Sequence, residues 1–279
     1  MIPGVTDSLK YVYHYRRVET AIEHILPLGR LRLGRYNCTN DPKEVKDWSF
    51  SIGSNEGRDL DGREWDELSK WFSSELKSKT RVLCFSRDEG GLTGNHLFDI
   101  CKRGFCKPRM WAQYGGNHTG VCLVFNKKRL LDNFISQYSD RFLLISGDVD
   151  YVDRTIADDL ILDQQYLINL DALELLGRSG YPEAHIRKHY KRLFFEKMKD
   201  WQAENEWRCV LFAKSDEELY LDYKDSLVGV IFGNDTSGES IAEVKRLSYG
   251  RGLAYQAVRW KNCAPWYDFA DPLFYAGSI

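Results

Sequence analysis

The chain has 279 residues, with 39 lysines and arginines against 41 aspartates and glutamates, and a formal net charge of −2 with neutral histidines. This balance excludes a strongly basic protein that holds nucleic acid mainly through phosphate contacts, although it allows a local basic strip. Hydrophobic residues at 43% and charged residues at 29% exclude disordered, collagen-like and coiled-coil chains.

Neither a membrane segment nor a secretion signal is expected. No apolar run approaches the ~20 residues that span a bilayer, and the first residues lack a charged stretch followed by an apolar one. The seven cysteines are an odd number and lie mostly in apolar runs, which indicates buried thiols rather than disulfides. We therefore expect a cytoplasmic protein.

Hydrophobic periodicity and turn residues divide the chain into strands and helices. In chain order, we predict a strand at 9–15, a helix at 18–26, a strand at 29–34, a turn at 40–44, a helix at 65–76 and a strand at 81–86. There follow a helical turn at 110–114, a strand at 119–125, a helix at 127–138, a strand at 142–151 and helices at 156–176 and 181–199. The last elements are strands at 206–213, 219–222 and 227–232, a helix at 237–247 and a strand at 254–260.

These elements predict a single α+β domain over residues 1–279, with a central mixed or antiparallel sheet flanked by helices. Strands and helices are interspersed without the regular alternation of a doubly wound fold. Residues 87–109 contain three close glycines and are interpreted as an inserted surface loop and a candidate lid. Residues 261–279 are rich in aromatic side chains and are interpreted as a tail packed on the core.

Common nucleotide and metal motifs are missing from the sequence. It contains no phosphate-loop, dinucleotide-binding or nucleophile-elbow glycine pattern, which argues against the usual ATPases, dehydrogenases and serine hydrolases. Four candidate zinc ligands lack the tight pairing of structural zinc sites: His96, Cys101, Cys106 and His118. His185 and His189 stand four residues apart, but they fit a solvated helix face better than a metal clamp. We therefore predict no metal site.

The most informative pattern is Glu204-Asn-Glu206, just before the apolar run that begins at Cys209. In a strand, two carboxylates spaced by two residues point to the same side. One carboxylate could then stabilise a developing oxocarbenium ion while the other takes a proton from the nucleophile. The structural alternative is an ion-paired strand end, in which Arg208 or Arg246 neutralises either glutamate.

Two further groups could contact a nucleotide. His14, between Tyr13 and Tyr15 and followed by Arg16, could donate to a ribose or phosphate at a strand end. Trp111 and Tyr114 stand three residues apart on a helical turn and could stack on a flat ring. The alternatives are a half-buried sheet histidine and two core aromatics beneath a glycine turn.

Taken together, these segments resemble the bacterial family known as domain of unknown function 2971. The resemblance rests on an ordered set of motifs: Val12-Tyr-His-Tyr15, Asn40-Asp-Pro-Lys-Glu44, Cys84-Phe-Ser86, Trp111-Ala-Gln-Tyr114, His118-Thr-Gly-Val121, Trp201, Glu204-Asn-Glu206-Trp-Arg208 and Val228-Gly-Val-Ile-Phe-Gly233. It extends over residues 10–260, and residues 87–109 are longer than is usual in that family. The family name implies no activity.

The order of a strand histidine, a central aromatic residue and a late glutamate is also similar to the plan of ADP-ribosyltransferases. That similarity implies a split sheet and NAD as substrate. By position, His14 would bind a ribose of NAD, Tyr114 would stack on nicotinamide, Glu206 would hold the ribose 2′-hydroxyl and Glu204 would activate the acceptor. The implied catalytic residues are Glu206, Glu204 and His14, and the implied NAD-binding residues are His14, Tyr15, Arg16, Trp111, Tyr114, Asn40, Asp41 and Ser86.

We therefore expect an NAD-dependent ADP-ribosyltransferase or NAD glycohydrolase, such as an intracellular toxin or antiphage effector that modifies protein or nucleic acid. One alternative is a non-catalytic module that binds a nucleotide or nucleic acid by base stacking. Another is a metal-independent nuclease with His14 or His118 as acid or base. Two basic strips could guide nucleic acid or form an ordinary solvated face: Arg30, Arg32 and Arg35, and Lys102, Arg103, Lys107 and Arg109.

Overall fold

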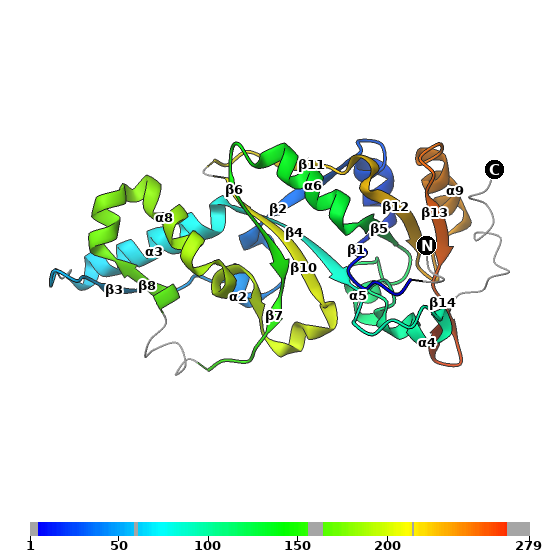
Figure 1. Ribbon diagram of the computed structural model, residues 1–279, viewed down its shortest axis with the longest axis horizontal. Helices are drawn as coiled ribbons and strands as arrows, with labels where there is room; N and C mark the ends of the chain where they lie inside the picture. Colours follow the sequence, from blue (N-terminus) through cyan, green and yellow to red (C-terminus); the bar gives the residue numbers. More distant parts are fainter. Residues whose placement is uncertain (1–4, 59–60, 156–163, 214, 267–279) are drawn as a thin grey trace.

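A mixed sheet runs through the centre of the molecule (Figure 1). The computed structural model describes residues 5–58, 61–155, 164–213 and 215–266. Within these residues the central sheet has nine strands in the order β11-β2-β4-β1-β5-β12-β13, and β10 followed by β6 extends it from β4. The strands are β1 (Tyr11–Arg16), β2 (Arg30–Arg35), β4 (Thr80–Arg87), β5 (Val121–Asn126), β6 (Leu143–Asp148), β10 (Glu206–Phe212), β11 (Leu219–Asp222), β12 (Leu227–Phe232) and β13 (Ala254–Ala257).

The sheet splits along one edge of β4. Strand β10 pairs with β4 in antiparallel register from Glu206 opposite Ser86 to Phe212 opposite Thr80. On the opposite edge, β2 pairs only with residues 81–82 and β1 only with residues 86–87. Between them, Nδ1 of His14 hydrogen-bonds to the carbonyl oxygen of Cys84 at 2.9 Å. Strands β1 and β2 therefore diverge from this edge, and a histidine side chain bridges the gap.

Helices cover both faces of the sheet (Figure 1). They are α1 (Val18–Thr20) and the π-helical turn η1 (Ala21–Ile25), α2 (Pro42–Val45), α3 (Gly62–Lys79), α4 (His96–Asp99), α5 (Pro108–Gln113), α6 (Lys127–Tyr138), α8 (Leu170–Phe194) and α9 (Gly238–Leu247). Shorter elements are 3₁₀ turns η2 (Tyr36–Cys38), η3 (Ile100–Lys102), η4 (Gln164–Tyr166), η5 (Lys199–Glu204) and η6 (Lys224–Ser226), and strands β3 (Ser51–Gly53), β7 (Asp150–Tyr151), β8 (Leu167–Asn169), β9 (Glu196–Lys197), β14 (Arg259–Lys261) and β15 (Ala264–Trp266).

Three apolar clusters fill the space between these layers. On one face, helices α6, α9 and α1–η1 pack in the first cluster, which contains Leu211 and Phe125. On the other face, the second cluster joins Tyr13 and Tyr15 to the segment before and within α5. The third cluster joins Phe212 to α3 and α8. Since successive strand residues point to opposite faces, the second and third clusters share a face, on either side of the split.

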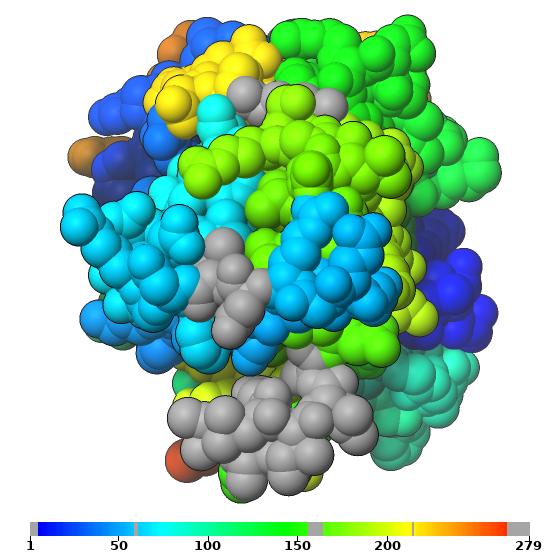
Figure 2. All heavy atoms as spheres, turned by 90° about the vertical axis from the view of Figure 1, so that its left-hand side faces the viewer, coloured from blue at the N-terminus to red at the C-terminus, as the bar shows by residue number. Residues whose placement is uncertain are grey.

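Helices α3 and α8 form the end of the molecule opposite β13. Figure 2 views this end directly and shows it covered by α3, α8 and residues 51–58. Helix α3 begins with a capping box, in which Asp61 accepts hydrogen bonds from the Arg63 and Glu64 backbones while Glu64 accepts one from Asp61. Its buried face contains Leu68, Phe72 and Leu76. The spacing of these apolar residues is the pattern that predicts the helix from the sequence.

The predicted α+β fold with a large mixed sheet is confirmed, but several local predictions are wrong. The predicted helix at 181–199 ends at Phe194, and residues 196–197 form β9. Residues 164–169 form η4 and β8 rather than the middle of a helix over 156–176, of which 156–163 lie outside the described residues. The turn at 40–44 is the short helix α2, with Asp41 as its N-cap. His185 is 6% exposed rather than solvated, because its ring packs against Phe72 and its Nε2 hydrogen-bonds to the carbonyl of Gln165 at 2.8 Å.

Residues 87–109 are not confined to the surface. Phe105 is fully buried in the second cluster. The carboxylate of Asp88 accepts hydrogen bonds from Tyr13 Oη at 2.9 Å, Arg103 Nε at 3.0 Å and Gly104 N at 2.8 Å. Burial raises the pKa of Asp88 and outweighs the opposite effect of Arg103. This buried network therefore fixes where the segment packs on β1. Of the predicted tail at 261–279, residues 267–279 lie outside the described residues.

Replacement of Asp88 by alanine should lower the free energy of unfolding by roughly 3–5 kcal/mol, since it removes one member of a buried ion pair. The side chains of Asp88 and Arg103 are 0% and 3% exposed. Urea unfolding measures the change. Asp132→Ala is the control, because Asp132 is exposed and pairs with Lys128 on the helix surface. Equal effects of the two substitutions would contradict the assignment.

The stability of the protein should fall as the pH drops from 6.5 toward 4. Burial lowers the pKa of His185 to about 4, whereas an unfolded histidine titrates near 6.5. The folded form therefore favours the neutral ring. The contribution of His185 to the free energy of unfolding is complete above pH 6.5, and it is lost at lower pH because the unfolded chain takes up a proton first. Urea unfolding at pH 7 and pH 4.5 should show a smaller pH dependence in His185→Phe than in the original chain. An identical pH dependence would refute this role.

Candidate functional site

The side chain of Lys197, on β9, lies between two glutamates. Its Nζ is 2.7 Å from Oε2 of Glu204 and 3.0 Å from Oε2 of Glu206. Glu204 and Glu206 are each 3% exposed, and Lys197 is 6% exposed. One buried ammonium group therefore holds the two carboxylates that the Glu-x-Glu pattern predicts to lie together.

The backbone at Asn205 brings the two glutamates together. Glu204 ends η5 and Glu206 begins β10, so the two residues are not both in a strand. Asn205 between them adopts a left-handed conformation with φ 43° and ψ 60°, and its Nδ2 donates to the carbonyl oxygens of Arg87 and Asp88. The sequence therefore predicts the correct proximity for the wrong reason: a sharp bend, rather than strand alternation, directs both carboxylates to Lys197.

Arg208 and Glu44 extend this cluster into the protein. Nε and Nη2 of Arg208 donate to the two carboxylate oxygens of Glu206, at 2.5 and 3.0 Å. Nη2 also donates to Oε1 of Glu44, and Nη1 donates to the carbonyl oxygen of Phe194 at 2.8 Å. The ion-paired alternative is therefore correct for Arg208, while Arg246 pairs with Glu243 on the surface.

The two glutamates differ in their pKa. Burial raises the pKa of Glu204, and the negative charge of Glu206 adds to this effect while Lys197 opposes it. For Glu206, burial acts in the same direction, but Arg208 and Lys197 outweigh it and lower the pKa to about 2. Adjacent carboxylates with opposite shifts are an arrangement suited to acid–base chemistry, since one stays ionised while the other can exchange a proton.

On the α2 side of the cluster, two buried carboxylate oxygens have no hydrogen-bond donor within the described residues. They are Oε2 of Glu44 and Oδ2 of Asp41. Oδ1 of Asp41 caps α2 by accepting from the backbone of Lys43 at 2.9 Å. Burial raises the pKa of Asp41, and Glu44 raises it further, against the effects of Lys197 and Arg208. The cluster thus offers acceptor oxygens to a ligand that carries hydroxyl or amine donors.

Tyr114, Asn40 and Arg16 lie where the cluster approaches the surface. The hydroxyl of Tyr114 donates to Oε1 of Glu204 at 2.8 Å, and the exposed Asn40 side chain hydrogen-bonds to the same hydroxyl. Burial lowers the pKa of the half-buried Arg16, an effect that nearby Cys84 and Tyr114 oppose. Tyr114 is half-buried, so this side of Glu204 is the one closest to solvent.

Other predicted ligand-binding residues lie elsewhere. Trp111 is fully buried, and its Nε1 donates to the carbonyl oxygen of Phe105 at 2.8 Å. The hydroxyl of Tyr15 donates to the carbonyl oxygen of Gly104 at 2.8 Å, and its ring packs edge-on against Trp111. Both side chains are core residues of the second apolar cluster, which is the structural alternative for Trp111, and their contact with a cofactor stays a prediction.

His14 and Ser86 hold the framework of the site. His14 is 4% exposed, and burial lowers the pKa of its ring, as does Arg16. The hydroxyl of Ser86 donates to the carbonyl oxygen of Glu204 at 2.8 Å, so it positions the end of η5. These contacts place both residues at the sheet split and its edge, and within the described residues no hydrogen bond joins either side chain to the carboxylate of Glu204 or Glu206.

The sequence prediction missed Lys197, Glu44 and Tyr151 as parts of the site. The hydroxyl of Tyr151 accepts a hydrogen bond from the Glu206 backbone at 2.9 Å. Glu44 lies in a motif that marked only a turn and a family resemblance. Lys197 is separated from the apolar run at 193–195 by Glu196, so the sequence carries no clear signal for a buried cation there. Only the fold brings its Nζ within 2.7 Å of Glu204.

Several residues of the basic strips are ion-paired, and no disulfide joins the cysteines of the described residues. Arg103 is buried beside Asp88, while Arg32 and Arg35 lie near Glu218 and Asp216. All seven cysteines are free thiols, and three of them are buried: Cys106, Cys122 and Cys209. Among the described residues, no group of three or more His, Cys, Asp or Glu side chains is arranged to hold a metal ion. No helix in this part of the chain is long and apolar enough to cross a bilayer.

Residues 110–209 match a family model described as protein of unknown function (DUF2971). The matched segment contains Tyr114, Lys197, Glu204, Glu206 and Arg208, and it supports the resemblance of this chain to that family. No curated protein and no solved structure matches the chain. The family description gives no activity, so a functional proposal depends on the geometry of the site.

Replacement of Lys197 by methionine should destabilise the protein strongly at pH 8 and less at pH 5. At pH 8, Glu204, Glu206 and Glu44 would keep only Arg208 as a buried counter-charge, a cost of roughly 3–5 kcal/mol. The folded-state pKa of Glu204, already raised by burial, should rise further without the ammonium. Lower pH then favours the folded form, which takes up a proton.

Urea unfolding at the two pH values checks this prediction. Lys199→Met is the matched control, since Lys199 lies two residues away with a side chain that is 60% exposed and 3.8 Å from Asp153. An equally large loss at pH 5 and pH 8, or an equal loss in the control, would contradict the coupling between Lys197 and Glu204.

Proposed function

We propose that the chain is an NAD-dependent glycosyl transferase that transfers ADP-ribose to an acceptor or to water. The observation that carries this proposal is the pair of carboxylates on Lys197, with the pKa of Glu206 lowered to about 2 and that of Glu204 raised. The split of the sheet beside β4 and the similarity in residue order to ADP-ribosyltransferases support it.

Glu206 supplies the fixed negative charge for the reaction. Cleavage of NAD breaks the bond between C1′ of the ribose and the nicotinamide nitrogen, and nicotinamide leaves with the electron pair. Positive charge then develops on the ribose, as in other glycosyl transfers. Because Arg208 and Lys197 keep Glu206 ionised, its carboxylate can accept a hydrogen bond from the 2′-hydroxyl and stabilise that charge.

Glu204 supplies the base. The nucleophile, a water molecule or a group on a protein or nucleic acid acceptor, forms a new bond to C1′ and releases a proton. A carboxylate whose pKa is raised is a better proton acceptor than an ordinary glutamate. Tyr114, which donates to Oε1 of Glu204 at 2.8 Å, holds that carboxylate on the solvent side. The unpartnered oxygens of Asp41 and Glu44 offer acceptors for further ribose hydroxyls.

Substitution Glu206→Gln should reduce nicotinamide release from NAD by about 100-fold or more, since it removes a charge that acts on the transition state. Release is followed by chromatography, with and without a cell extract that supplies acceptors. Glu243→Gln is the control, because Glu243 pairs with Arg246 on the surface. Thermal unfolding of each variant separates loss of chemistry from loss of fold.

The substitution Glu204→Gln tests, independently of Glu206, whether Glu204 acts as the base. The original chain should gain activity as the pH rises through the raised pKa of Glu204, because the base acts when deprotonated. In the variant, activity should no longer rise with pH over this range. Folded protein that binds NAD but consumes none, with binding insensitive to Glu206→Gln, would overturn the proposal and favour a nucleotide-binding module. Nucleic acid cleavage without NAD would favour a nuclease.

A further inference from the structure

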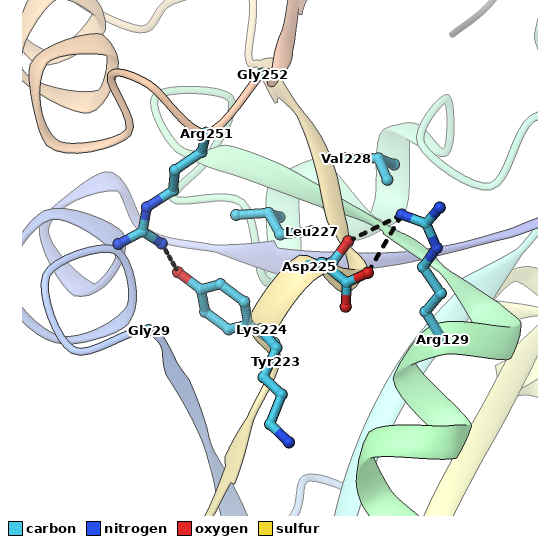
Figure 3. A pocket seen from close by; sticks show the side chains of 9 residues that line it. All are labelled: Gly29, Arg129, Tyr223, Lys224, Asp225, Leu227, Val228, Arg251 and Gly252. Carbon is cyan, nitrogen blue, oxygen red and sulfur yellow. Dashed lines mark hydrogen bonds and ion pairs between the residues drawn. The ribbon is translucent and has the colours of Figure 1, made fainter.

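A pocket of about 570 Å³ lies where β12 begins (Figure 3). Its lining consists of Gly29, Arg129, Tyr223, Lys224, Asp225, Leu227, Val228, Arg251 and Gly252. Tyr223 and Leu227 belong to the first apolar cluster, which also contains α6. A volume of this size is within the range of small-molecule sites.

This pocket is separate from the glutamate site. Strand β12, which begins at Leu227, is four strands from β10 in the order β10-β4-β1-β5-β12. At a strand spacing of ~4.8 Å, this is about 19 Å across the sheet. The pocket lies at the start of β12, where Leu227 packs in the first cluster and Val228 against the second, and the width of the sheet separates it from the glutamates.

Three cations and one carboxylate line the pocket, which leaves an excess of two positive charges. The ammonium group of Lys224 is exposed and makes no hydrogen bond or ion pair within the described residues. Arg129 is 55% exposed and lies 3.5 Å from Asp225, which is 71% exposed, so solvent weakens this pair. Both cations are therefore available to an anionic ligand.

Arg251 is held in place by the protein. Its Nη1 donates to the hydroxyl of Tyr223 at 2.8 Å, and its Nη2 donates to the carbonyl oxygen of Leu26 at 2.9 Å. A guanidinium group has five N–H donors. These two hydrogen bonds therefore fix its orientation and leave other N–H groups for a ligand. In Figure 3, Arg251 and Arg129 stand on opposite sides of the pocket, with Leu227 between them.

We propose that this pocket binds a small organic phosphate. A phosphate monoester carries close to two negative charges at neutral pH, which matches the excess charge of the lining. Arginine pairs well with phosphate oxygens because its N–H groups form a planar fork. Arg129 and Lys224, which are exposed, hold the phosphate, Arg251 adds its positive charge from the opposite side of the pocket, and the apolar side chains of Leu227 and Val228 contact the organic part. The pocket is thus a second ligand site, independent of the proposed NAD chemistry.

Isothermal titration calorimetry with ribose 5-phosphate tests this site, with inorganic phosphate and succinate as comparison ligands. The double variant Arg129→Gln, Lys224→Gln should weaken binding of ribose 5-phosphate at least tenfold. Arg141→Gln is the matched control, since Arg141 has a side chain that is 57% exposed and pairs with Glu217 at 3.0 Å. Arg251 is left intact because it also anchors Leu26 and Tyr223.

Weakened binding in the double variant, unchanged binding in Arg141→Gln and a lower affinity for succinate would support the site. Absence of saturable binding, equal affinities of the double variant and the control, or equal affinity for succinate would overturn it. Nicotinamide release from NAD, where it occurs, should be unchanged in the double variant. Because calorimetry reads binding alone, failure of the NAD proposal does not affect this test.

Discussion

The ammonium group of Lys197 between Glu204 and Glu206 is the interaction on which the rest of the site depends. Together with Arg208 and Glu44 it forms a buried network of charges between the second and third apolar clusters. Replacing such a network by apolar side chains is often neutral or stabilising, whereas removing one partner costs several kcal/mol. The network therefore contributes to stability only while all of its members are present.

The split of the sheet creates the place for this network. Strands β1 and β2 pair with different parts of the same edge of β4. Between these parts, the His14 side chain hydrogen-bonds to the carbonyl oxygen of Cys84. The apolar clusters on either side are then far enough apart to admit polar side chains between them. Short chain segments line this region: α2 contributes Glu44, and the bend at Asn205 contributes Glu204. Their positions depend on the divergence of the strands.

The two proposed sites have opposite electrostatic character. The glutamate site combines acceptor oxygens with a fixed anion, and so it favours hydroxyl groups and developing positive charge. The pocket beside Arg129 and Arg251 has an excess of positive charge and favours an anion. Because four strand spacings of ~4.8 Å, about 19 Å of sheet, separate them, ligands at the two sites have no direct contact. Any influence of one ligand on the other would have to pass through the strands between them.

Hydrophobic periodicity in the sequence determined most strands and helices, the α+β class and the importance of Glu204-x-Glu206. These features are local, because the spacing of apolar residues along the chain sets which face of each element is buried. Only the tertiary structure decided that Lys197, Glu44 and Arg208 surround those carboxylates, that Trp111 and Tyr15 are core residues, and that the pocket at Tyr223 exists. Burial and ion pairing join residues that are distant in sequence, and strand order, which local patterns do not encode, selects the partners.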